Sequence, residues 1–215
     1  MTKRLVDVVA GSVLALLAFP VVVLLAFATL CSMRCSPFFV QPRVGCGGKL
    51  FPCWKLRTLP KGASTEADKY SIRSISIPRF ARFLRSTHLD ELPQLFLVPI
   101  GLMTLVGPRP EMASLHNGGD PDFAMARTSV RPGCTGLWQT SVDQNRLIWE
   151  APQYDLFYLR HQSLRLDAWI LWRTVATALR LRPPISLDDV PRKVVANDPP
   201  HRPGQPLAAP GRIIG

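Results

Sequence analysis

The sequence has 215 residues, of which 47% are hydrophobic, so it can form one domain of ordinary size with its own core and some additional segments. Its formal net charge of +11 predicts an anionic partner: nucleic acid, an anionic membrane surface or a phosphorylated substrate. Five cysteines without a paired CxxC motif indicate reduced thiols rather than disulfides or a zinc site.

The N-terminal region contains an uncharged run at residues 8–30, VVAGSVLALLAFPVVVLLAFATL, which is long enough to cross a bilayer. The run is too long for a secretory signal peptide and lacks a clean cleavage site. Pro20 predicts a break or a kink in the helix, and each half of about 12 residues would extend only roughly 18 Å. Basic residues flank both ends of the run: Lys3, Arg4, Arg34, Arg43 and Lys49.

Positive charge favours the cytoplasmic side of a membrane, and here it lies at both ends of the run. The pattern therefore favours a helix–break–helix that enters the membrane and returns to the same side. A kinked helix that spans the membrane once is the alternative, because proline kinks are tolerated in spanning helices.

Residues 36–182 are predicted to form the main domain. Glycines and prolines divide residues 36–60 into short apolar runs, which predicts short strands. The stretch SIPRFARFLRS, residues 76–86, has an arginine at every third position, which is typical of a basic amphipathic helix suited to lipid headgroups or bound phosphates. An ordinary surface helix has the same pattern.

The end of the chain contains two further segments. Residues 154–181 predict one or two amphipathic helices, with Trp169 and Trp172 either at a membrane interface or in the core. Residues 183–215 contain eight prolines and little periodicity, which predicts a flexible tail.

An acidic pair stands out in STHLDELPQL, residues 86–95. Asp90 and Glu91 are the only carboxylates between residues 69 and 110, and they are surrounded in the sequence by arginines. Pro93 is tolerated only in the first turn of a helix, so a helix through PQLFLV must begin near residues 89–93. Both carboxylates then lie at a helix N-terminus, where free N–H groups favour a carboxylate or a bound phosphate.

The helix dipole and the arginines are expected to lower the pKa values of both carboxylates and to keep them ionised at neutral pH. Simple N-capping would explain one acid at this place. N-capping would not explain a second acid in a segment whose other charged residues are mostly arginines.

The segment LRSTHLDELPQLFLVPIGLMTLVGPRP resembles the signature of the bacterial sugar transferases, the monotopic phosphoglycosyl transferases. Four other segments agree with this family in the expected order: KRLVDVVAG, RVGCGGKLFPCWKLRTL, RPGCTGLWQTS and YDLFYLRHQSLRLDAWILWRT. The stretch QTSVDQNRL departs from the usual QVSGRN pattern of the family.

The resemblance implies a membrane-associated α/β fold with three parts. Residues 1–35 would form a re-entrant membrane helix broken at Pro20. Residues 36–182 would form a small cytosolic catalytic domain with short strands and interfacial amphipathic helices, in a chain that resembles the small catalytic form of the family. Residues 183–215 would be a proline-rich tail.

The resemblance also implies an activity. Such enzymes transfer a phospho-sugar from a UDP-sugar to undecaprenyl phosphate and release UMP, require Mg²⁺, and work on the cytoplasmic face of the bacterial inner membrane. Their products start exopolysaccharide, lipopolysaccharide or glycoprotein glycans, and nucleic acid is not a partner.

The resemblance assigns roles to six residues. Asp90 would be the nucleophile on the β-phosphate, Glu91 would assist through the metal or the acceptor phosphate, and both are candidate Mg²⁺ ligands. The candidate phosphate contacts are Lys55, Arg57, Arg85 and Arg109.

Two other functional classes remain open on the sequence alone. A membrane-anchored basic protein that binds anionic lipid or nucleic acid would explain the charge but would leave the acidic pair without a role. A single-pass anchored glycosyltransferase would transfer the sugar without its phosphate. The nucleotide released distinguishes these classes: UMP, UDP or none.

Overall fold

The computed structural model describes residues 2–60, 77–116 and 120–195. Its strands are short and form two small sheets, an antiparallel sheet of order β2-β1-β4 and a parallel pair β3-β5. The strands are β1 (Phe38–Val44), β2 (Leu50–Leu56), β3 (Thr104–Val106), β4 (Glu111–Met112) and β5 (Gly133–Thr135). The short strands predicted within residues 36–60 are confirmed as β1 and β2.

The β1–β2 hairpin is the largest regular part of the sheets. The two strands pair over their whole length, from Phe38 opposite Leu56 to Val44 opposite Leu50. The turn between them contains the 3₁₀ helix η1 (Cys46–Gly48), where Gly47 and Gly48 adopt positive φ angles of 67° and 73°. Only glycine adopts this conformation at little cost, so the Gly-Gly pair in the sequence defines the turn.

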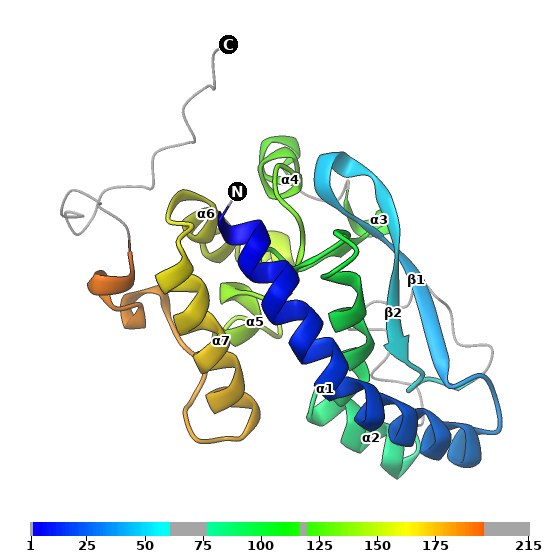
Figure 1. Ribbon diagram of the computed structural model, residues 1–215. Helices are drawn as coiled ribbons and strands as arrows, with labels where there is room; N and C mark the ends of the chain where they lie inside the picture. The colour runs from blue at the N-terminus through cyan, green and yellow to red at the C-terminus, as the bar shows by residue number, and fades with distance from the viewer. Residues whose placement is uncertain (1, 61–76, 117–119, 196–215) are drawn as a thin grey trace.

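Helices surround the sheets (Figure 1). They are α1 (Thr2–Met33), α2 (Arg79–Ser86), α3 (Ala113–His116), α4 (Pro121–Thr128), α5 (Leu137–Thr140), α6 (Gln153–Arg160) and α7 (Leu164–Ala178). The predicted basic helix is confirmed as α2, where Ala81 and Leu84 face the core and Arg79 and Arg82 are exposed. The amphipathic helices predicted within residues 154–181 are confirmed as α6 and α7.

The N-terminal helix α1 is one continuous element of 32 residues that includes Pro20. It bends midway along its length and crosses the molecule between α7 and the β1–β2 hairpin (Figure 1). An 18-residue stretch of the helix has a mean hydropathy of 2.8, and by length and composition the helix is able to cross a membrane. The predicted interruption at Pro20 is therefore a bend in an unbroken helix, as proline permits when neighbouring groups support the chain.

One stripe of α1 packs against the rest of the protein. The buried residues recur every three or four positions, which is one face of a helix: Asp7, Gly11, Ala15, Ala18, Val22, Ala26 and Thr29. Most of them are small, so the helix approaches its neighbours closely. The opposite face exposes large apolar side chains along the whole helix, with Leu16 at 74% and Leu24 at 69% exposure.

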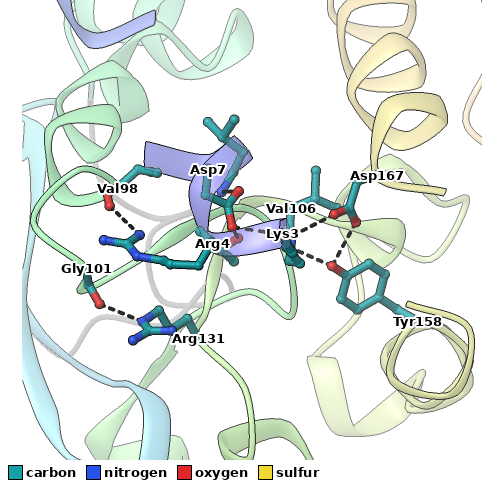
Figure 2. Close-up of polar contacts among 11 residues, drawn as sticks. Lys3, Arg4, Asp7, Val98, Gly101, Val106, Arg131, Tyr158 and Asp167 are labelled. Carbon is teal, nitrogen blue, oxygen red and sulfur yellow. Dashed lines mark hydrogen bonds and ion pairs between the residues drawn. The ribbon is translucent and has the colours of Figure 1, made fainter. Parts of the chain in front are cut away.

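Polar contacts fasten the start of α1 to the domain (Figure 2). Lys3 Nζ donates to Asp167 Oδ2 of α7 at 2.6 Å, and Asp7 accepts a hydrogen bond of 2.5 Å from Thr104 Oγ1 of β3. Arg4 donates to two backbone carbonyl oxygens at 2.8 and 3.0 Å, just beyond the central 3₁₀ helix η3 (Leu89–Leu97). The N-terminal end of the long apolar helix α1 is thus attached to the domain by its own charged side chains.

Residues 183–195, which the sequence assigned to the flexible tail, pack on the domain. Ile185 and Val190 are 2% and 7% exposed and belong to the main hydrophobic core. Ile185 also forms a parallel bridge with Ser141. Two 3₁₀ helices lie in this segment, η5 (Leu187–Asp189) and η6 (Arg192–Val194). The remainder of the predicted tail, residues 196–215, lies outside the described residues.

Candidate active site

The acidic pair occupies the first turn of η3 (Leu89–Leu97). His88 precedes the helix with a positive φ of 57°, which turns the chain sharply before the helix starts. Pro93 lies inside the helix and is buried. The helix therefore begins where the position of the proline predicted, although it is a 3₁₀ helix rather than an α-helix.

A pocket of about 270 Å³ opens beside the pair and brings distant parts of the chain together. All six predicted site residues line it: Lys55, Arg57, Arg85, Asp90, Glu91 and Arg109. They come from the end of β2, the end of α2, the start of η3 and the loop between β3 and β4. Residues 55–57, 85–91 and 109 are separated in the sequence, and the fold brings these three segments together at one site.

Glu91 is held by two cations. Lys55 Nζ lies 2.7 Å from Glu91 Oε1, and Arg109 contacts both oxygens, with Nη2 at 2.6 Å from Oε1 and Nη1 at 3.2 Å from Oε2. Burial alone would raise the pKa of Glu91, but the charges and hydrogen bonds of Arg109 and Lys55 outweigh it and hold this pKa well below its ordinary value. Glu91 is therefore a fixed anion at neutral pH.

Asp90 has a different environment. It is 8% exposed, borders the pocket, and makes no hydrogen bond or ion pair with any residue that the structure describes. Burial, and then the negative charge of Glu91, raise the pKa of Asp90 above its ordinary value, although Lys55 and Arg85 oppose this. The expectation that both carboxylates have lowered pKa values is thus correct for Glu91 and wrong for Asp90, because loss of hydration dominates at Asp90.

The other two predicted phosphate contacts are anchored at the pocket edge. Arg57 Nε donates to the carbonyl oxygen of Ser36 at 2.9 Å, and the guanidinium lies 5.7 Å from the ring centre of Phe39. Arg85 Nη1 donates to Thr58 Oγ1 at 3.2 Å. Each guanidinium keeps further N–H groups for a bound anion, since arginine has five.

Two arginines of the pocket were not predicted as site residues. Arg43 of β1 donates to Gln41 Oε1 at 2.7 Å, and burial followed by repulsion from Arg109 lowers the pKa of Arg43 to about 10. Arg146 follows α5, and its side chain is 55% exposed. Alternation along β1 could have indicated Arg43, because residues two apart share a face of the hairpin. Arg146 lies in the stretch QTSVDQNRL, and because this stretch departs from the family pattern, the resemblance did not identify Arg146 as a site residue.

The acidic pair is better suited to a magnesium ion that keeps water and substrate ligands than to a metal ion whose ligands all come from the protein. Among residues 2–60, 77–116 and 120–195, no group of three or more His, Cys, Asp or Glu side chains is placed to hold a metal ion. Magnesium commonly takes one or two carboxylates and completes its shell with water and substrate phosphates. Asp90 offers an unpaired carboxylate at the pocket wall, with Glu91 beside it, so these residues fit such an ion.

These features define a cationic pocket with one free carboxylate, next to a long apolar helix. The chain belongs to the bacterial sugar transferase family, whose family model, "Bacterial sugar transferase", matches residues 1–181.

Curated relatives agree with this family. A Klebsiella pneumoniae protein named UDP-glucose:undecaprenyl-phosphate glucose-1-phosphate transferase is 36% identical over 185 residues, covering 80% of this chain and 39% of the relative. A Caulobacter vibrioides protein of the same name is 34% identical, covering 82% of this chain and 69% of the relative. The Salmonella typhimurium undecaprenyl-phosphate galactose phosphotransferase is 33% identical, covering 83% and 40%. The chain thus spans about two fifths of the length of most of these relatives.

Proposed function

We propose that the protein transfers a sugar 1-phosphate from a UDP-sugar to undecaprenyl phosphate and releases UMP. The observation that carries this proposal concerns the described residues: among them Asp90 is unpaired, and its carboxylate lies at the wall of a pocket to which they contribute six cationic side chains. Both proposed substrates bring phosphates, which such a pocket would bind. The names of the relatives from Klebsiella pneumoniae and Salmonella typhimurium agree with this reaction for glucose and galactose.

Asp90 is the proposed nucleophile. One of its oxygens would bond to the β-phosphorus of the donor, while the bond from that phosphorus to the bridging oxygen breaks and UMP departs with the electron pair. An oxygen of undecaprenyl phosphate would then attack the same phosphorus and release Asp90. Asp90 has no salt bridge to any described residue, which supports this role, because a carboxylate paired with an arginine or lysine must first lose that partner.

Cations must offset the repulsion between a carboxylate and a phosphate, which is large at about 4 Å in a poorly solvated site. Arg85 lies close enough to Asp90 to affect its pKa, and Arg57 keeps free N–H groups at the same pocket. Bound Mg²⁺, held by Asp90 and Glu91, would neutralise phosphate charge and polarise the phosphoryl oxygen. Glu91 would in addition fix Lys55 and Arg109 in place.

We also propose that α1 is re-entrant and places the domain on the cytoplasmic face of the bacterial inner membrane. Asp7, near its start, bonds to β3, and Ala26, near its end, packs with Leu56 of β2 and Leu84 of α2. Both ends of the helix therefore rest on one domain. A helix that crossed the bilayer would have to carry α2 and the end of β2 into it, including the exposed arginines of α2.

The released nucleotide tests the reaction. Purified protein in lipid or detergent, given Mg²⁺, undecaprenyl phosphate and UDP-glucose or UDP-galactose, should release UMP and form a lipid-linked sugar diphosphate. The product would start an exopolysaccharide or lipopolysaccharide. Release of UDP would instead support a glycosyltransferase that leaves the phosphate behind. Lack of any nucleotide release across a panel of UDP-sugars would support a non-catalytic, anion-binding protein.

A further inference from the structure

The segment that presents Arg109 to the pocket is held at three successive carbonyl oxygens. The carbonyl of Pro108 accepts from the backbone N–H of Gly133 at 2.9 Å, and that of Arg109 accepts from Arg127 Nη2 at 2.6 Å. The carbonyl of Pro110 accepts from Arg43 Nη1 at 3.2 Å. Because both flanking residues are prolines with restricted φ angles, the backbone at Arg109 has little freedom.

All three nitrogens of the Arg127 guanidinium, on α4, donate hydrogen bonds: Nη2 to the Arg109 carbonyl, and Nε and Nη1 to two carboxylates. Its Nε lies 2.7 Å from Asp155 Oδ2 of α6, and its Nη1 lies 2.9 Å from Glu111 Oε2 of β4. The side chains of Arg127, Glu111 and Asp155 are 4%, 8% and 3% exposed. The planar fork of arginine thus joins two carboxylates and the Arg109 carbonyl in one buried network.

Stability alone is a poor explanation for this network. Removing three charged groups from water is costly, and well-packed apolar residues are often as stable or more stable at such places. Apolar side chains, however, cannot donate a directed hydrogen bond to a particular carbonyl oxygen. That oxygen belongs to the residue whose side chain holds Glu91, and Arg127 itself is not among the residues that line the pocket.

We propose that Arg127 is a positioning residue of the candidate active site, which holds the backbone of Arg109 so that the Arg109 guanidinium stays on Glu91. This inference deepens the proposed function and rests on it for its catalytic consequence. A displacement of about 1 Å at a catalytic group can reduce the rate about 100-fold, so a loose Arg109 should impair turnover without any loss of charge in the pocket.

An unfolding experiment tests the positioning without any assay of activity. Thermal midpoints of the purified full chain are measured for Arg127→Lys, Glu91→Gln and the double variant, and then for Arg127→Lys, Arg131→Lys and their double variant. Arg131 provides the matched control, because its Nε donates to a different carbonyl, that of Gly101, at 2.9 Å (Figure 2). Positioning predicts that Arg127→Lys and Glu91→Gln are non-additive, since both act through Arg109. Additive shifts in both cycles would overturn the inference.

Activity provides the second measurement. Arg127→Lys should lower UMP release about 10- to 100-fold, Arg131→Lys should leave it unchanged, and Arg127→Lys should add little once Arg109 is replaced by Lys. Equal losses in both backgrounds would show a merely structural role. If Arg127→Lys fails to fold, Asp155→Asn replaces it, because an amide keeps the acceptor oxygen but loses the charge. A wild-type protein without UMP release would refute the proposed function, and the unfolding cycles would still decide the positioning.

Discussion

The two neighbouring carboxylates of the site have opposite electrostatic properties. The pKa of Glu91 is held well below its ordinary value by Arg109 and Lys55, after burial has acted against them, whereas burial and Glu91 raise the pKa of Asp90. Such a separation assigns different roles to adjacent acids. Glu91 is suited to ordering cations, and Asp90 is suited to forming a bond.

Asp90 should become covalently modified during the reaction. Incubation with Mg²⁺ and the correct UDP-sugar, without lipid acceptor, should add one phospho-sugar to the protein, which intact-mass spectrometry detects. In Asp90→Asn the adduct should be absent and turnover should fall about 10³-fold or more, because the amide is a poor nucleophile. Asp122→Asn is the matched control, since Asp122 is exposed on α4.

The opposing mechanism is direct attack by the lipid phosphate in a ternary complex. In that case the wild-type protein would show no adduct with the donor alone. UMP would then appear only when both substrates are present, and Asp90 would serve as a metal ligand.

Asp90→Asn should also stabilise the fold. The raised pKa of Asp90 means that its ionised form is less favourable in the folded protein than in the unfolded chain. This cost is present at pH values above the folded pKa and disappears as the pH falls below the ordinary value of 3.8. Asp90→Asn should therefore raise the thermal midpoint at pH 7, and the difference from wild type should shrink towards pH 4. A lower midpoint at pH 7 would contradict the unpaired, buried carboxylate.

At the scale of elements, the close contact between α1 and η3 depends on a glycine. A Cβ atom at Gly11 would lie 2.6 Å from Val98 Cγ1, just beyond the end of η3. The long apolar helix α1 and the segment at the end of η3 can therefore approach each other this closely only if this position has no side chain.

Gly11→Ala should push α1 away from η3. We expect a loss of about 1–3 kcal/mol in unfolding free energy, as for other over-packed contacts, together with reduced turnover. Leu16→Phe provides the comparison, because it adds volume on the exposed face of the same helix. When unfolding free energy and UMP release are measured for both variants, both quantities should be lower in Gly11→Ala than in Leu16→Phe. Equal behaviour would indicate that α1 does not dock tightly.

Local patterns predicted the elements well. Arginine spacing predicted α2, the glycines and prolines predicted the hairpin, and Pro93 predicted where η3 begins. Each of these signals depends on residues close together in the chain.

The properties that depend on distant partners were not predictable in this way. Burial of Asp90 reverses its pKa shift, and Arg127 meets Asp155 across 28 positions of sequence. The packing of Ile185 likewise gave no periodic signal in a proline-rich segment. Assigning Lys55, Arg57, Arg85 and Arg109 to one site from the sequence required the family resemblance, because three separate segments supply them.

At the scale of the whole molecule, the proposed re-entrant arrangement predicts that both flanks of α1 face the cytoplasm. Thiol labelling tests it after the exposed Cys31 and Cys46 and the half-buried Cys35 and Cys134 are replaced by serine, which leaves only the buried Cys53. Single cysteines from Thr2→Cys and Leu50→Cys should then react with a membrane-impermeant reagent in inverted inner-membrane vesicles and not in intact cells.

Labelling of the two positions from opposite sides would establish a spanning helix. Pro20→Ala gives a second measurement, because removal of the bend should straighten α1 and shift part of the population towards that spanning form.

The ring of Phe96 in η3 meets Phe19 of α1 edge-on, with centroids 6.4 Å apart, and η3 also carries Asp90 in its first turn. If α1 lies in the bilayer as proposed, this one short helix fixes the distance of the proposed nucleophile from the membrane surface. An acceptor confined to that bilayer is encountered by lateral diffusion, so its density per unit area should govern the rate. Diluting the acceptor lipid with inert phospholipid should slow UMP release, whereas diluting the proteoliposomes at constant lipid composition and saturating donor should leave turnover per enzyme unchanged. A turnover that followed the bulk concentration of acceptor instead would mean that its phosphate leaves the surface to react.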